Sequence, residues 1–109
     1  MSKIENKIKE IKQEIQNEEC VKEYYRLKKI IKEDKALYSL DMDIKRLQKQ
    51  MCENRKNEEI FSSLNKEYDS KVKEFETNPL IIDYKISEVE VRNYLLQIKD
   101  ILEQKWLLL

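Results

Sequence analysis

The sequence contains no glycine and no histidine, and only one proline among its 109 residues. Without glycine the chain lacks a phosphate-binding loop, a dinucleotide-binding turn and the usual tight hairpin turn, because each needs backbone angles that glycine adopts at low cost. Without histidine it has no Ser-His-Asp or Cys-His arrangement and no histidine-based zinc or di-iron site. We therefore expect no catalytic residue and no metal ligand set, and predict that the protein is not an enzyme.

An excess of charge of one sign is also missing, and so are long hydrophobic runs. The 22 Lys and Arg residues balance 22 Asp and Glu residues. Because nucleic-acid-binding surfaces usually carry a basic excess, no direct contact with nucleic acid is expected. The longest apolar runs, at residues 80–82 and 106–109, are far shorter than the ~20 residues of a membrane span, so no membrane association is expected. With two cysteines and no secretory type of N-terminal segment, we expect a reduced, cytoplasmic protein.

Apolar residues recur at helical spacing along the whole chain. Ser2 begins a Ser-x-x-Glu pattern, which is typical of a capping box at the start of a helix. The apolar positions change register between Ile15 and Val21. This change predicts a break near residues 16–18, with Asn17 as the N-terminal cap of the next helix.

The middle of the chain predicts two helices that run antiparallel. Asp34 is a suitable cap, and a regular heptad pattern follows it: Leu37, Leu40, Ile44, Leu47 and Met51. Residues 53–59 contain no apolar side chain and two asparagines, which predicts a polar turn. Helical spacing then resumes with Phe61, Leu64, Tyr68, Val72 and Phe75.

Asn78 and Pro79 predict the start of a long C-terminal helix, because Asn suits the cap and Pro suits the first helical position. Its apolar surface exceeds what one neighbouring helix can cover, so we expect a central helix that the others and a second subunit bury. The predicted interface consists of Leu80, Ile82, Tyr84, Val91, Leu95, Ile98, Leu102 and Trp106.

These patterns predict an all-α fold. We expect an elongated antiparallel bundle of about four to five helices, forming a single domain over residues 1–109. Because such a bundle has a thin core, and oligomerisation is a common way to stabilise one, the protein is expected to be a homo-oligomer.

Several motifs, taken in order, resemble the YlbF/YmcA family. The run from Asn78 to Tyr84, Asn-Pro-Leu-Ile-Ile-Asp-Tyr, and the apolar helix from Glu90 to Leu102 resemble the C-terminal signature of that family. Upstream, the Tyr-containing stretch 21–27, the acidic Asp34 and the Leu-Gln-Lys step at 47–49 look like its middle section. The resemblance covers roughly residues 15–103.

The resemblance implies a small, cytoplasmic, all-α bacterial protein of the kind first named for control of competence, biofilm formation and sporulation. The implied partners are a YaaT-like protein, other YlbF/YmcA-like proteins and endoribonuclease Y, in a complex that steers mRNA processing. The implied function is that of a non-enzymatic regulatory adaptor. The alternative is a structural or chaperone-like helical oligomerisation module with no link to RNA processing.

The two cysteines have two interpretations. The complex that the resemblance implies is associated with iron–sulfur clusters, which usually take four thiolate ligands. Cys20 and Cys52 supply two, with no CxxC spacing, so a cluster would need ligands from other subunits. The favoured alternative is that both are small apolar side chains near the helix seams. We therefore expect no resident cofactor.

Basic and aromatic groups are equally open to two interpretations. Seven basic side chains could form a phosphate-binding patch or a solvated face interleaved with acids, and we favour the second; they are Arg26, Lys28, Lys29, Lys32, Lys45, Arg46 and Lys49. The six tyrosines could form a recognition surface or pack at the edge of the core. Tyr24 and Tyr84 are expected to be structural because they lie on apolar seams.

Overall fold

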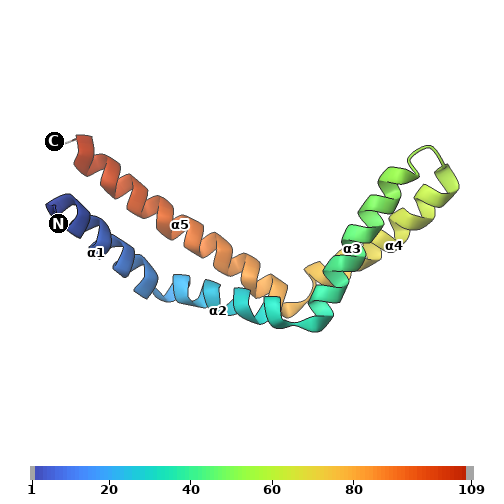
Figure 1. Ribbon diagram of the computed structural model, residues 1–109, viewed down its shortest axis with the longest axis horizontal. Helices are drawn as coiled ribbons and strands as arrows, with labels where there is room; N and C mark the ends of the chain where they lie inside the picture. The colour runs from blue at the N-terminus through green and yellow to red at the C-terminus, as the bar shows by residue number, and fades with distance from the viewer. Residues whose placement is uncertain (1, 108–109) are drawn as a thin grey trace. The chain divides into compact units, whose positions relative to one another are not determined.

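A computed structural model describes residues 2–107, with side chains described through residue 105. It contains five helices in the order α1 (Lys3–Asn17), α2 (Glu19–Glu33), α3 (Lys35–Glu53), α4 (Glu58–Glu76) and α5 (Pro79–Leu107) (Figure 1). Residues 2–107 include no strand. The predicted all-α fold class and the long C-terminal helix are therefore confirmed.

Side-chain caps define the starts of the later helices as the sequence predicts. The Asp34 carboxylate accepts a hydrogen bond from the Leu37 backbone N–H at 3.0 Å, immediately before α3. The Asn78 side-chain oxygen accepts from the Leu80 N–H at 2.9 Å, and Pro79 is the first residue of α5. These bonds satisfy N–H groups that have no partner within the first turn of a helix.

The predicted break after the first helix is confirmed, but its cap is a different residue. α1 starts after Ser2, whose hydroxyl accepts from the Glu5 N–H at 3.2 Å. Asn17 is the last residue of α1, so the prediction that it caps the next helix is wrong. Glu18 instead adopts the extended backbone (φ −68°, ψ 134°) that separates the helices, and its carbonyl accepts from the Val21 N–H at 3.1 Å.

The chain divides into two compact units. We call Met1–Lys28 with Asp83–Leu109 the terminal unit, and Lys29–Ile82 the hairpin unit. Their boundaries fall inside α2 and α5. The single domain predicted over residues 1–109 stays a prediction.

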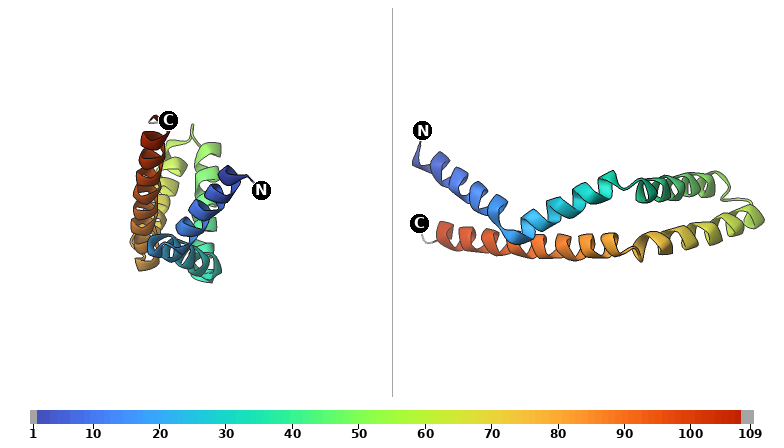
Figure 2. Two further views of the ribbon diagram at one scale, coloured as in Figure 1. Left: turned by 90° about the vertical axis from the view of Figure 1, so that its left-hand side faces the viewer. Right: turned by 90° about the horizontal axis from the view of Figure 1, so that it is seen from below.

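In the hairpin unit, α3 and α4 lie side by side and run antiparallel (Figures 1 and 2). The polar turn between them begins at Asn54 and ends at Asn57, whose side chain accepts from the Ile60 N–H at 3.2 Å. The heptad prediction is confirmed, because the α3 positions are buried or half-buried, with Leu47 fully so at 0% exposure. The predicted α4 positions are half-buried: Phe61, Leu64, Tyr68, Val72 and Phe75.

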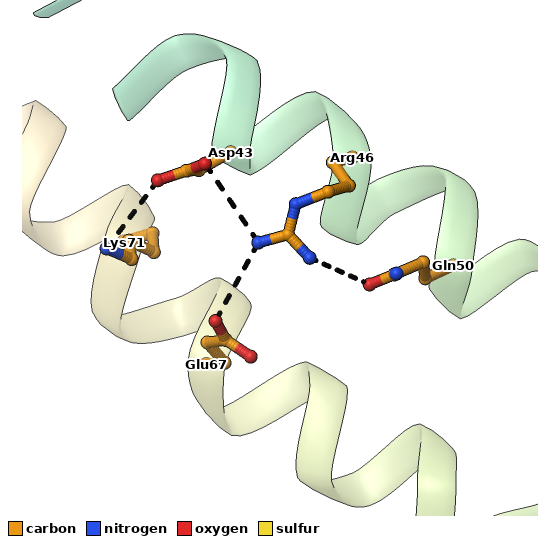
Figure 3. A network of polar contacts seen from close by, with 5 residues as sticks. All are labelled: Asp43, Arg46, Gln50, Glu67 and Lys71. Atoms are coloured by element: carbon orange, nitrogen blue, oxygen red, sulfur yellow. Dashed lines mark hydrogen bonds and ion pairs between the residues drawn. The ribbon is translucent and has the colours of Figure 1, made fainter. Parts of the chain in front are cut away.

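A polar network joins α3 to α4 along one edge of this seam (Figure 3). The Arg46 guanidinium lies 4.0 Å from the Glu67 carboxylate on α4, and it donates to the Gln50 side chain at 3.2 Å. Asp43 lies 4.0 Å from the same guanidinium and 3.8 Å from the Lys71 ammonium of α4. Each exposed ion pair stabilises little, but together they match only one register of the two helices.

In the terminal unit, α1 and the first part of α2 run antiparallel to α5 (Figure 1). The buried side chains are Val21 and Leu27 of α2 and Ser87 of α5. α1 has no buried residue, and its Ile4 and Ile8 side chains are 73% and 56% exposed. The core of this unit therefore sits where α2 meets α5.

The expectation that the other helices of the chain bury α5 as a central helix is wrong, whereas its burial by a second subunit stays a prediction. Seven large apolar side chains of α5 are 42–54% exposed: Ile82, Ile86, Val89, Leu95, Leu96, Ile101 and Leu102. The apolar composition of α5 correctly indicated that this helix has a large apolar surface. It did not indicate how much of that surface the chain covers itself, because composition does not count neighbours.

Candidate interaction surfaces of helix α5

The predicted interface residues are distributed over different environments of α5. Leu80, Tyr84, Val91 and Ile98 are half-buried within the chain. Ile82, Leu95 and Leu102 are exposed, at 42%, 42% and 46%. The side chain of Trp106 lies outside the described residues. That these residues form an interface stays a prediction.

A pair of tyrosines anchors α2 to α5. The Tyr24 and Tyr84 rings are stacked, with centroids 5.3 Å apart and planes 24° apart, and their hydroxyl oxygens are 3.2 Å apart. The Tyr25 ring packs edge to face against the Tyr24 ring, with their centroids 5.3 Å apart. The Lys28 ammonium lies 5.8 Å from the centroid of the Tyr24 ring. Tyr24 and Tyr84 therefore have a structural role, since each contributes buried area, ring stacking and a hydrogen bond to the contact between α2 and α5.

The hydrogen bond between the Tyr84 and Tyr24 hydroxyl groups, followed by burial, raises the pKa of Tyr84 from its ordinary 10.0 to about 12. Tyr84 therefore keeps its proton in the folded chain at pH values where the unfolded chain loses it. The contribution to stability is full below pH 10 and is lost as the pH rises from 10 towards 12.

This linkage gives a testable expectation for Tyr84→Phe. The difference in unfolding free energy between the wild type and the variant should shrink between pH 10 and pH 12, because only the wild type has this proton to lose. Urea unfolding followed by circular dichroism at a series of pH values measures the difference. A difference that stays constant across this range would contradict the assignment.

The inner side of α5 continues from Tyr84 at helical spacing through Ser87, Val91, Tyr94 and Ile98, all of them buried or half-buried. Burial first, and then the charge of Glu18, raises the pKa of Tyr94.

Towards the ends of the terminal unit the same apolar faces are left uncovered. Ile11 and Ile15 of α1 are half-buried, whereas Ile4 and Ile8, one and two turns earlier on the same stripe, are exposed. On α5, Leu95, Ile101 and Leu102 are likewise 42–52% exposed, although Ile98 between them is half-buried. We call the uncovered residues the open arm: Ile4, Ile8, Leu95, Ile101 and Leu102.

A second stripe lies on the opposite side of α5, and the predicted interface contains only its first residue, Ile82. Ile86, Val89 and Leu96 are 54%, 48% and 49% exposed, and Asn93 between them is exposed as well. We call Ile82, Ile86, Val89, Asn93 and Leu96 the outer stripe. Its regular spacing is visible in the sequence, but the stripe is easily missed because a polar residue interrupts it.

Comparison with protein-family models finds one that covers nearly the whole chain. The model described as "Control of competence regulator ComK, YlbF/YmcA" matches residues 4–105. The chain belongs to the YlbF/YmcA family. This confirms the resemblance inferred from the Asn78-Pro79 motif and the helices around it, and it places the chain among regulators of competence. A comparison with curated proteins gave no significant match.

The cysteines of this YlbF/YmcA chain do not fit an iron–sulfur cluster by themselves. Cys20 belongs to the terminal unit and Cys52 to the hairpin unit, and a cluster usually takes four thiolates. Among the described residues, no group of three or more His, Cys, Asp or Glu side chains could hold a metal ion. Burial, followed by the charges of Glu18 and Glu90, raises the pKa of the Cys20 thiol, which opposes the thiolate that iron requires. The absence of a resident cofactor stays a prediction.

The two thiols should differ in reactivity. Cys52 is exposed and borders an open groove between α3 and α4, whereas Cys20 is half-buried with a raised pKa. N-ethylmaleimide should therefore label Cys52 at least about fivefold faster than Cys20 in the native protein. Peptide mass spectrometry over a time course measures both rates, and labelling in urea is the control, where the rates should converge. Equal labelling rates in the native protein would contradict the half-buried environment described for Cys20.

Three of the seven basic side chains pair with neighbouring acids in this YlbF/YmcA chain. Arg26 donates to the Glu23 carboxylate at 2.9 Å and lowers the pKa of that carboxyl. The Lys45 ammonium lies 2.9 Å from the Asp41 carboxylate, which raises the pKa of Lys45. Arg46 is shared between Asp43 and Glu67. Such mixed charge favours a solvated face over a phosphate-binding patch, and the expectation of no direct nucleic-acid contact stays a prediction.

Among residues 2–105, no helix is both long enough and apolar enough to cross a membrane.

Proposed function

We propose that this chain is a non-enzymatic regulatory adaptor of the bacterial cytoplasm that works by binding other proteins. Its partners would be a YaaT-like protein and other YlbF/YmcA-like proteins, in a complex that modulates mRNA processing by endoribonuclease Y. The observation that carries the proposal is the family match over residues 4–105. Control of competence, biofilm formation and sporulation would follow from altered transcript processing.

The open arm is the surface that best supports a binding role. Soluble proteins rarely leave contiguous apolar patches uncovered unless a partner binds there. Ile4 and Ile8 on α1 are 73% and 56% exposed, and Leu95 and Leu102 on α5 are 42% and 46% exposed. Apolar side chains at helical spacing suit a partner helix, which would pack against the exposed side chains of α1 and α5.

Binding between purified proteins tests the proposal. A YaaT-like protein from the same bacterium is titrated with the wild-type chain and with Leu95→Ser combined with Leu102→Ser. Loss of two exposed leucines from a central contact should weaken binding at least about tenfold. Ile60→Ser is the matched control, because Ile60 is 45% exposed but lies on α4, and its affinity should equal that of the wild type.

The exposed outer stripe favours a second candidate, the structural oligomerisation module. A module of that kind would bind copies of itself and would not bind the YaaT-like protein. No binding by the wild-type chain in the titration above would support this second candidate and contradict the adaptor.

A further inference from the structure

Tyr24 and Tyr84 bring two oxidisable rings from different helices into direct contact. Their ring centroids are 5.3 Å apart, the ring planes differ by 24°, and the hydroxyl oxygens are 3.2 Å apart. Because the hydroxyl oxygens are closer together than the centroids, the two rings converge at their hydroxyl ends. The carbons ortho to each hydroxyl, through which oxidised tyrosines join, lie at these converging ends. The fold therefore holds the reactive edges of two phenols together before any oxidation takes place.

Tyr25 provides a comparison within the same cluster. Its ring centroid is also 5.3 Å from that of Tyr24, but the two planes are 79° apart, so an edge of one ring meets the face of the other. Tyr25 is 61% exposed, whereas Tyr24 and Tyr84 are half-buried. Equal separations with different orientations distinguish mere proximity from an arrangement that suits coupling.

We propose that Tyr24 and Tyr84 are a site of oxidative modification, at which hydrogen peroxide with an iron or haem catalyst joins the two rings as dityrosine. Each phenol loses one electron and one proton and becomes a phenoxyl radical. The two radicals form a single bond between their ortho carbons, and the hydrogens of those carbons move to the oxygens, which restores both phenols. Hydrogen peroxide accepts the two electrons and two protons and becomes two water molecules, so the chain loses two hydrogen atoms in total.

The contact between the rings favours this coupling over competing reactions. Groups held near contact distance in a suitable orientation react as if they were at a very high concentration. The hydrogen bond between the two hydroxyls lets a hydrogen atom pass from one ring to the other, so a radical formed on either ring stays within the pair. Half-burial of both rings limits their contact with tyrosines of other molecules. The new bond is therefore expected within one chain.

The cross-link fixes α2 to α5 inside the terminal unit. Tyr24 and Tyr84 are 60 positions apart in the sequence, so the bond closes a long loop and restricts the unfolded chain, as a disulfide does. The oxidised protein should therefore unfold at a higher urea concentration than the unmodified protein. This consequence holds whether or not the proposed adaptor function does, because it depends only on the contact between α2 and α5.

Oxidation of the full chain under native conditions tests the proposal. The wild type, at low protein concentration, is treated with a small haem peptide and limiting hydrogen peroxide, and dityrosine is followed by its fluorescence. Trypsin digestion should then give one main cross-linked product that joins residues 23–26 to residues 74–85. Its mass should be lower than the sum of the two peptides by two hydrogen atoms.

Phenylalanine variants identify the two rings that react. Tyr24→Phe and Tyr84→Phe should each lower the yield of intrachain dityrosine at least about tenfold, because one reacting phenol is missing. Tyr25→Phe is the matched control and should leave the yield unchanged. The wild type oxidised in urea is a second control that does not depend on the folding of a variant, and its yield should fall as far as that of Tyr24→Phe.

Four results would overturn the proposal. They are a native wild-type yield no higher than that of Tyr24→Phe, equal yields in native buffer and in urea, a main product that Tyr25→Phe abolishes, and a purified cross-linked chain with an unchanged urea midpoint.

Discussion

Leu47→Ala should lower the free energy of unfolding by about 3 kcal/mol. Leu47 is 0% exposed and lies in the middle of the α3 heptad, between Leu40 and Met51. Removing its buried methyl groups costs their transfer free energy and leaves a cavity that a hairpin held by side-chain packing can only partly close. Urea unfolding followed by the helical circular dichroism signal measures the loss.

The matched control is Met42→Ala on the same helix. Met42 is 47% exposed, so its truncation removes little buried area and introduces a better helix former. Its effect should be below about 0.5 kcal/mol. Equal effects from Leu47→Ala and Met42→Ala would mean that the α3–α4 seam is not the core of the hairpin unit.

Two substitutions of Ser87 should change stability in opposite directions. Ser87 is 3% exposed, and among the described residues its hydroxyl has no hydrogen-bond partner. Ser87→Ala removes a buried polar group that nothing satisfies, so it should stabilise the chain by about 1 kcal/mol. Ser87→Leu adds three carbon atoms at a position that is already enclosed, so it should destabilise the chain by about 2 kcal/mol.

The opposite signs separate this explanation from a simple preference for apolar residues, which would make leucine the more stabilising of the two. Thermal and urea unfolding of the three proteins give the ranking. A stabilising Ser87→Leu would show that this side of α5 is loosely packed. A destabilising Ser87→Ala would show that the hydroxyl has a partner.

Local chemistry explains why the helix boundaries could be predicted so well. Asp34, Asn57 and Asn78 accept hydrogen bonds from N–H groups two or three residues later, so their effect depends only on nearby sequence. Asn17 is the exception, because either Asn17 or Glu18 could have taken the extended backbone at the break. The heptad of α3 was equally visible, since one neighbouring helix covers one stripe.

The surfaces of α5 depend on contacts that the sequence does not encode locally. Tyr24 and Tyr84 are distant in the chain, and only the fold shows that they stack. Leu95 and Leu102 have nearly the same helical phase as the half-buried Val91 and Ile98, yet they are exposed, and helical phase alone does not predict that difference. The burial of Ser87 could not be predicted from the sequence, because a polar residue is not expected in a core.

The most direct measurement is the mapping of transcript ends in the native bacterium. The chromosomal copy of this chain is replaced by the Leu95→Ser and Leu102→Ser double variant, and in a second strain by Ile60→Ser. If the chain steers endoribonuclease Y by recognition through the open arm, the double variant should lose the processed ends as fully as a deletion does, while Ile60→Ser should keep them. Unchanged ends in the deletion strain, or normal processing with the double variant at normal protein levels, would contradict this role.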